Sequence, residues 1–169
     1  MEKQIYTEET DEVKLDSKDK KILKILVENA RTPLSVIARK TGIPKDSVLY
    51  RVRRLEKLNA VQYVTIINPL RMGYHLFKFV NLILHNFTPD REKKLLSYLL
   101  TDPLIIYVAQ TSGRYDYTVG IVAKNTKHFG DIMKNLRTKF SDIIKDFESV
   151  DILGEYKYDY IVDLIKETK

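Results

Sequence analysis

The side chains best suited to recognition chemistry gather between Pro44 and Leu58. On a helical wheel of about 100° per residue, Val48, Val52 and Leu55 form a narrow apolar stripe. Most of the remaining positions carry guanidinium, ammonium, hydroxyl or phenol groups. A guanidinium group can donate two hydrogen bonds to one guanine, and a hydroxyl can reach a base or a phosphate. The pattern predicts a helix in the major groove of DNA, with contacts from Lys45, Ser47, Tyr50, Arg51, Arg53, Arg54 and Lys57.

Two shorter helical patterns precede this segment and would position it. Asp16 is suited to cap a helix over about residues 17–29, and Pro33 to begin a second helix that Gly42 ends. Two short helices around a glycine-containing turn predict a helix-turn-helix arrangement. An amphipathic helix with a charged solvent face has the same wheel pattern, but the preceding helix and turn favour DNA binding.

The charged residues are distributed unevenly along the 169 residues, whose net charge is +6. Residues 1–16 hold two basic and six acidic residues, residues 17–68 hold twelve and four, and residues 69–169 hold fifteen and thirteen. A basic segment beside a nearly neutral one is typical of a polyanion-binding module joined to another domain. A solvated lysine-rich surface gives the same counts, so charge alone leaves both interpretations open.

Several classes of site find no support in the composition. The chain has no Cys, which excludes disulfides, thiolate metal sites and Cys nucleophiles. His75, His85 and His128 do not have the spacing of metal ligands. No apolar run approaches the roughly 20 residues that cross a bilayer, and the acidic N-terminus does not resemble a signal peptide. We therefore expect no metal, cofactor, catalytic residue or membrane contact, and a cytoplasmic location.

The second half of the chain alternates strand and helix patterns. The strands are expected at 75–87, 105–111, 117–123 and 143–153, the helices at 89–101 and 126–140, and a last extended segment at 156–164. This βαββαβ order, with one further strand, predicts a four-stranded antiparallel sheet with both helices on one face, which is the ferredoxin-like plan. An open sheet face with bulky aromatic residues favours pairing with a second copy. A homodimer would place two third helices on DNA half-sites about one helical turn apart.

The segment between the two halves indicates where the domains divide. Residues 60–67 are rich in β-branched side chains and predict a strand or small hairpin, the wing of a winged helix. We favour a role in closing the core for this wing, with phosphate contact as an addition. Breaks at Asn68-Pro69 and Gly73 indicate a linker. We expect an α+β chain with an acidic flexible tail (1–15), a winged helix-turn-helix domain (16–67), a linker (68–74) and a ferredoxin-like effector-binding and oligomerisation domain (75–169).

Taken together, these motifs resemble the Lrp/AsnC family of transcription regulators over about residues 15–160. The most specific match is Arg51-Val52-Arg53-Arg54-Leu55-Glu56, supported by Leu15-Asp16, by Thr41-Gly42-Ile43 and by a Gly-x-Tyr-Asp turn at 113–116. The resemblance implies a winged-helix domain that binds double-stranded DNA. It also implies a homodimer, with tetramers and octamers as larger assemblies, and effectors, commonly amino acids, bound where neighbouring C-terminal domains meet.

The resemblance places four residues near such an effector: Gly113, Arg114, Tyr115 and Asp116. Glycine N–H groups and a nearby acid can hold the carboxylate and ammonium of an amino acid. The same residues also suit a plain hairpin turn in which Gly113 adopts a positive φ and Asp116 binds local backbone. We favour the plain turn for this chain.

Two other functions remain as alternatives. Siroheme decarboxylases resemble the same two-domain architecture and use basic and His side chains in the C-terminal half. The strongly basic third helix favours a regulator over such an enzyme, since catalysis does not require it. The second alternative is a small-molecule-binding oligomer with a vestigial DNA-binding domain, whose DNA affinity would be weak and indifferent to sequence.

Overall fold

The computed structural model describes residues 12–153 and 161–165. The chain divides into two compact units, one from residues 1–65 with 157–169 and the other from residues 66–156. We call the first unit the head and the second the sheet domain. Most of the predicted acidic tail lies outside the described residues, and residues 161–165, close to the C-terminus, belong to the head.

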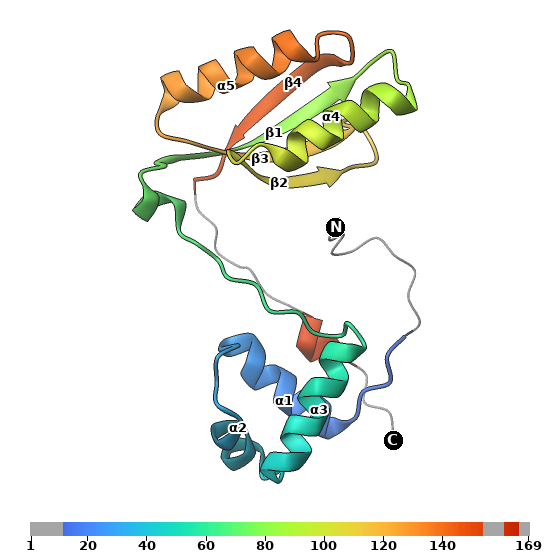
Figure 1. Cartoon of the computed structure of the whole chain (residues 1–169), viewed down its shortest axis with the longest axis vertical. Coiled ribbons are helices and arrows are strands. Elements are labelled where there is room, and N and C mark those ends of the chain that lie inside the picture. The colour runs from blue at the N-terminus through green and yellow to red at the C-terminus, as the bar shows by residue number, and fades with distance from the viewer. Residues whose placement is uncertain (1–11, 154–160, 166–169) are drawn as a thin grey trace. The chain divides into compact units, whose positions relative to one another are not determined.

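Three helices form the head: α1 (Ser17–Glu28), α2 (Leu34–Thr41) and α3 (Lys45–Lys57) (Figure 1). The side chain of Asp16 accepts hydrogen bonds from the N–H groups of Lys18 and Asp19, which caps α1 as predicted. Gly42 ends α2 with a φ of 71°, a left-handed conformation that glycine adopts without steric cost. The predicted helix-turn-helix arrangement is therefore confirmed.

The core of the head consists of two small clusters of buried side chains. One cluster joins all three helices through Ile22, Leu26, Ile37, Ile43, Val48 and Val52. The other contains Leu15, Leu23, Leu55 and Val162, and so combines α1, α3, the residue before the α1 cap and a residue near the C-terminus. Leu15, which the predicted tail included, is thus part of the packed structure.

The predicted wing is not formed as a strand. Residues 60–67 have no regular secondary structure, and Val64, Ile66 and Ile67 are exposed. High β-propensity does not make a strand without a neighbour to complete its hydrogen bonds, and these residues have no strand partner within the described residues of this chain. The prediction of a strand or hairpin here was therefore wrong.

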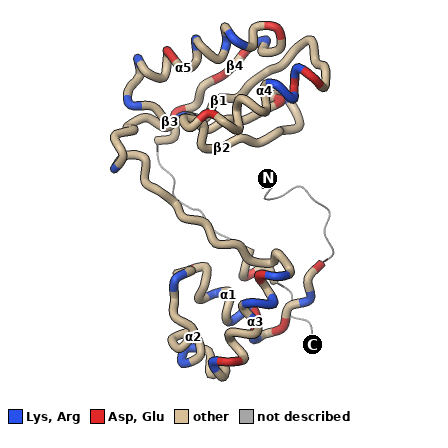
Figure 2. The backbone as a smooth tube through the Cα atoms, in the orientation of Figure 1, with Lys and Arg blue, Asp and Glu red and all other residues tan. Residues whose placement is uncertain are grey.

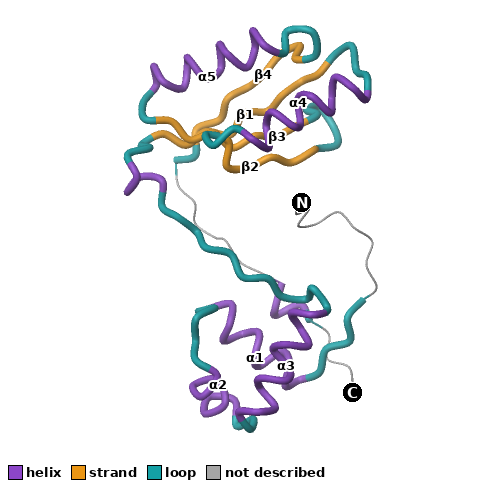
Figure 3. Tube along the Cα trace, viewed as in Figure 1, coloured by secondary structure: helices purple, strands orange, loops and turns teal. Residues whose placement is uncertain are grey.

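The sheet domain follows the predicted βαββαβ order (Figures 1 and 3). A 3-10 turn, η1 (Pro69–Met72), leads into it. Its elements are β1 (Leu76–Leu84), α4 (Pro89–Thr101), β2 (Ile105–Gln110), β3 (Tyr117–Ala123), α5 (Thr126–Lys139) and β4 (Ile144–Asp151). The strands form one antiparallel sheet in the order β2-β3-β1-β4. This is the order of a ferredoxin-like fold, so the predicted fold class is confirmed.

The two faces of the sheet differ because strand side chains alternate. Val80, Leu82, Val119 and Ile121 face the helices and share one core with residues of α4 and α5. The opposite face carries Phe77 and Phe79 of β1 and Tyr107 of β2. Their rings form edge contacts, with centroids 5.0 Å apart for Phe77–Phe79 and 5.5 Å apart for Phe79–Tyr107. An aromatic row therefore lies on the face that no helix of this domain covers.

The predicted last extended segment, residues 156–164, falls partly outside the described residues, which resume at Ile161. Ile161–Leu164 form a 3-10 helix, η2, rather than a strand. No helix in the described ranges is long and apolar enough to cross a bilayer.

Gly120 tests the packing of the open sheet face. A Cβ atom at this position would lie 2.8 Å from Tyr107 Cβ and 3.1 Å from Phe77 Cε2. We expect Gly120→Ala to reduce the free energy of unfolding by about 1–3 kcal/mol, because the strand and the ring must move apart. Gly130→Ala is the control, since Gly130 lies in α5 and an added Cβ would meet no atom within 4 Å apart from its chain neighbours and the backbone of its own helix. It should stabilise the helix by about 0.5–1 kcal/mol. Urea unfolding measures the free energy of unfolding of both variants. Equal values for the two would contradict the packing described.

Candidate nucleic-acid interface

Helix α3 is held in the head by one face. Val48 and Leu55 are fully buried and Val52 nearly so, which confirms the predicted apolar stripe. Gly42 and Ile43 form the turn that connects α2 to α3, and Ile43 is buried in the same cluster as Val48. The helix therefore has a fixed rotation about its own axis, and that rotation decides which of its cations point outward.

The outward face of α3 carries five of the seven predicted contact residues. Lys45, Tyr50, Arg53 and Lys57 are exposed, and Ser47 is half-buried. Tyr50 is 70% exposed, unusual for so large a side chain. Figure 2 shows basic residues recurring along this helix. Within the described part of the chain, no hydrogen bond or ion pair engages the side chains of these five residues, so their polar groups face solvent.

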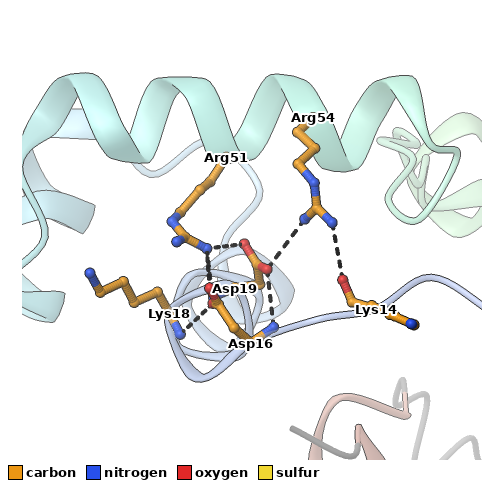
Figure 4. A network of polar contacts seen from close by, with 6 residues as sticks. All are labelled: Lys14, Asp16, Lys18, Asp19, Arg51 and Arg54. Atoms are coloured by element: carbon orange, nitrogen blue, oxygen red, sulfur yellow. Dashed lines mark hydrogen bonds and ion pairs between the residues drawn. The ribbon is translucent and has the colours of Figure 1, made fainter. Parts of the chain in front are cut away.

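Arg51 points to the other side, toward the start of α1 (Figure 4). Its Nη1 atom lies 2.8 Å from both carboxylate oxygens of Asp16 and 2.8 Å from Oδ1 of Asp19. Only 20% of the Arg51 side chain is exposed. Desolvation opposes its charge, but hydrogen bonds to Asp19 and Asp16 outweigh this, and the pKa of Arg51 is raised. The guanidinium is therefore committed to a contact inside the head.

Arg54 joins the same network from the next turn of α3 (Figure 4). Its Nη1 atom lies 3.4 Å from Oδ2 of Asp19, and its Nη2 atom donates to the carbonyl oxygen of Lys14 at 3.1 Å. Two of the three arginines in the most specific motif thus bind α1 and the residues before it. Only Arg53 of the three directs its guanidinium to solvent.

Asp19 is the centre of this network. Its side chain is 2% exposed and receives hydrogen bonds from two guanidinium groups and from the Asp16 N–H. An isolated carboxylate buried to this extent would be strongly destabilising, so the two cations are required rather than optional. Asp16 supports the cluster from the helix cap. Burial opposes its charge, but hydrogen bonds from the Asp19 N–H and Arg51 lower its pKa.

Arg51, Arg53 and Arg54 were all predicted to contact DNA, and this network was not predicted. Two signals could have revealed it. Asp19 stands one turn before Ile22 and Leu23 and so falls on the buried stripe of α1. On the α3 wheel, Arg51 lies about 60° and Arg54 about 120° to one side of Val48, whereas Arg53 lies about 140° to the other side. A cation next to an apolar stripe points toward the neighbouring helix, where a buried acid can meet it.

The predicted effector residues lie together in the turn between β2 and β3. Gly113 has a φ of 126°, where a side chain would be strained. Asp116 accepts a hydrogen bond from the Leu84 N–H at 2.7 Å through Oδ2, and Arg114 lies over the Tyr115 ring. The Tyr115 hydroxyl binds Glu148. Gly113 therefore supplies the positive φ of a hairpin turn, and Asp116 binds the backbone beside it.

Within the described ranges, no three His, Asp or Glu residues are grouped so that they could hold a metal ion. His75, His85 and His128 therefore do not gather with acids into such a site.

Comparison with known proteins gives consistent matches. The model of the AsnC-type helix-turn-helix domain matches residues 15–56. The chain is 32% identical over 122 residues to the HTH-type transcriptional regulator FL11 of Pyrococcus horikoshii, covering 72% of this chain and 79% of that protein. It is 30% identical over 132 residues to the HTH-type transcriptional regulator LrpA of the same organism, covering 78% and 92%.

Solved structures share the fold. An AsnC family transcriptional regulator from Agrobacterium tumefaciens matches with a TM-score of 0.80 at 21% identity, covering 90% of this chain and 100% of that chain. The Neisseria meningitidis transcriptional regulator NMB0573, solved as a complex with L-Met, matches with a TM-score of 0.80 at 21% identity, covering 89% and 99%.

Removing the charge of Asp19 tests the network. Asp19→Asn leaves two guanidinium groups without their buried anion, so we expect the head to lose about 3 kcal/mol of stability. Asp46→Asn is the matched control, because Asp46 is an exposed acid in the first turn of α3 and should cost less than about 1 kcal/mol. Hydrogen exchange of the α1 and α3 amides measures both. Equal protection in the two variants would mean that the buried carboxylate contributes nothing.

Acid should weaken the head through Asp16. Because its pKa in the folded head lies below the ordinary value of 3.8, its carboxylate stabilises the fold at neutral pH, and this contribution disappears as the pH falls through the lowered value. Asp16→Asn keeps a capping side chain but has no charge to lose. We expect it to be less stable than the parent at pH 7 and to lose less stability between pH 4 and pH 2. Melting curves across this range give the comparison, and parallel profiles for the two proteins would refute it.

Proposed function

The chain belongs to the Lrp/AsnC family of transcription regulators, and from that premise we propose that α3 enters the major groove of its operator. The proposal assigns contact with DNA to the outward side chains, namely Lys45, Ser47, Tyr50, Arg53 and Lys57. It assigns Arg51 and Arg54 a positioning role, because their guanidinium groups are held by Asp19. The division between inward and outward cations on one helix is the observation that carries this proposal.

Among the outward side chains, Arg53 is the best candidate for reading a base. It is exposed, its guanidinium has no partner in the described residues, and it can take O6 and N7 of one guanine together. Lys45 and Lys57 lie at the two ends of the helix, where an ammonium group can neutralise a phosphate on either side of the groove. Tyr50 offers a hydroxyl and an aromatic edge between them.

We also propose that the open face of the sheet forms a homodimer. Phe77, Phe79 and Tyr107 lie on this face, and Val150 of β4 pairs with Phe79 on the same side. Tyr107 is 48% exposed and Val150 39% exposed, so this apolar surface is available for a partner. A dimer supplies two α3 helices for two half-sites, and larger assemblies such as tetramers or octamers would be built from it.

An amino acid is the effector class that we propose for this chain, and the Gly113–Asp116 turn, which first serves as a hairpin, offers Arg114 for its carboxylate. The support is indirect, from the relative solved as a complex with L-Met. In this chain Arg114 is exposed and supplies a cation for a carboxylate, while Asp116 uses only Oδ2 to bind the Leu84 N–H. We propose no catalytic activity, because the relatives are transcription regulators by name. Binding to chromosomal DNA would place the protein in the cytoplasm.

Selection of duplexes from random DNA by the purified protein would yield an operator with which to test the contact residues. We expect Arg53→Ala to weaken operator binding by about 1–3 kcal/mol without changing the melting temperature. Arg54→Ala should lower the melting temperature, because it also opens the Asp19 network. Lys134→Ala removes an exposed cation from α5 and serves as the control, with affinity unchanged.

The salt dependence of binding separates this proposal from a vestigial head. Loss of a phosphate contact in Lys57→Ala should reduce the slope of log affinity against log salt by about 1. Weak binding that shows no preference among sequences, or an Arg53→Ala variant that binds like the parent, would refute the assignment of α3.

A further inference from the structure

A segment close to the C-terminus packs into the head, against residues that are far from it in the sequence. Val162 of η2 is 9% exposed and shares a cluster with Leu15, Leu23 and Leu55, and Ile165 packs against the same cluster. In contrast, Ile161 is 72% exposed and Leu164 76% exposed. One face of this short segment is therefore buried against the head and the other faces solvent.

Two polar contacts accompany this packing, both with α1. Lys20 Nζ donates a hydrogen bond to the carbonyl oxygen of Ile165 at 2.9 Å, and Lys24 Nζ lies 2.7 Å from Asp163 Oδ1. The Lys24–Asp163 pair is largely exposed, so water and salt screen it and its contribution to stability is small. We therefore expect burial of Val162 and packing of Ile165 against the same cluster to contribute more than this ion pair.

The cluster that receives Val162 joins the same two helices as the Asp19 network. Leu23 stands one turn after Asp19 on α1, and Leu55 follows Arg54 directly on α3. Without Val162, Leu23 and fully buried Leu55 would lose part of their apolar cover. The orientation of α3 against α1 thus depends on an ionic contact at one place and on an apolar contact at another.

We propose that residues 161–165 are a structural part of the DNA-binding unit, which hold α1 against α3 and thereby set the affinity of the head for DNA. The proposal rests on the DNA-reading role of α3 proposed above. The family match covers residues 15–56 and leaves this segment outside the DNA-binding domain. In the folded chain, however, residues 161–165 belong to the same compact unit as residues 12–65, so the head is built from both ends of the described chain.

The full chain with Val162→Ser tests the proposal, and Leu164→Ser is its matched control. Both variants shorten an aliphatic residue of η2, but only the first removes a buried side chain. In Val162→Ser we expect the amides of α1 and α3 to exchange at least about tenfold faster, with those of the sheet domain unchanged. Operator affinity should fall by at least about threefold, the reduction expected from a loosened recognition helix. Leu164→Ser should match the parent in both measurements.

The outcomes separate the two proposals. Unchanged exchange in α1 and α3 would overturn the structural role of the segment, even if the parent protein binds DNA. Faster exchange with unaltered operator affinity would overturn its influence on DNA binding. If the parent shows no operator binding at all, the function proposed for α3 fails, while the exchange result still decides the structural role.

A cross-link gives a second measurement on a folded protein. A carbodiimide joins an amine to an adjacent carboxylate, and we expect it to link Lys24 to Asp163 and to slow exchange in α1. Mixing isotope-labelled and unlabelled chains before cross-linking identifies the chain that donates the segment. A link within one chain never carries both labels, so cross-links that join a labelled to an unlabelled chain would overturn the assignment of the segment to its own head.

Discussion

A carboxylate that is sealed between helices needs cations close by, and in the head this requirement falls on Asp19. Arg51 and Arg54 satisfy it from α3, while Asp16 holds Arg51 from the cap of α1. Together with the buried apolar face of α3, these contacts fix the rotation of the helix, so the side chains on its far side have a defined direction as well. Arg53 thus points outward on a helix whose other two arginines, Arg51 and Arg54, point inward.

Most of the fold could be predicted because its signals are local. Pro89 and the Thr88 cap begin α4 where the sequence indicated, and Gly42 ends α2 for a stereochemical reason that needs no tertiary contact. The wing could not be predicted in this way. A strand requires another strand, and the β-branched run at 60–67 carries no information about whether a partner exists within the chain.

The buried stripe of α3 was predictable, but the direction of each individual arginine was not. Arg51, Arg53 and Arg54 have the same chemistry, and their separation into supporting and outward groups depends on their angular positions around α3 and on Asp19 in another helix. The C-terminal segment was beyond prediction for a different reason. It buries one valine from a single 3-10 turn, which is too short to show any periodicity.

The composition of the head from two distant parts of the chain has a consequence for the order of events during translation. Residues 12–65 leave the ribosome first, but Val162 follows only after the entire sheet domain has been synthesised. The sheet domain is continuous in sequence and has all of its core side chains at an earlier moment. The sheet face proposed for dimerisation is therefore complete on a nascent chain before the three-helix head gains its last packing residue.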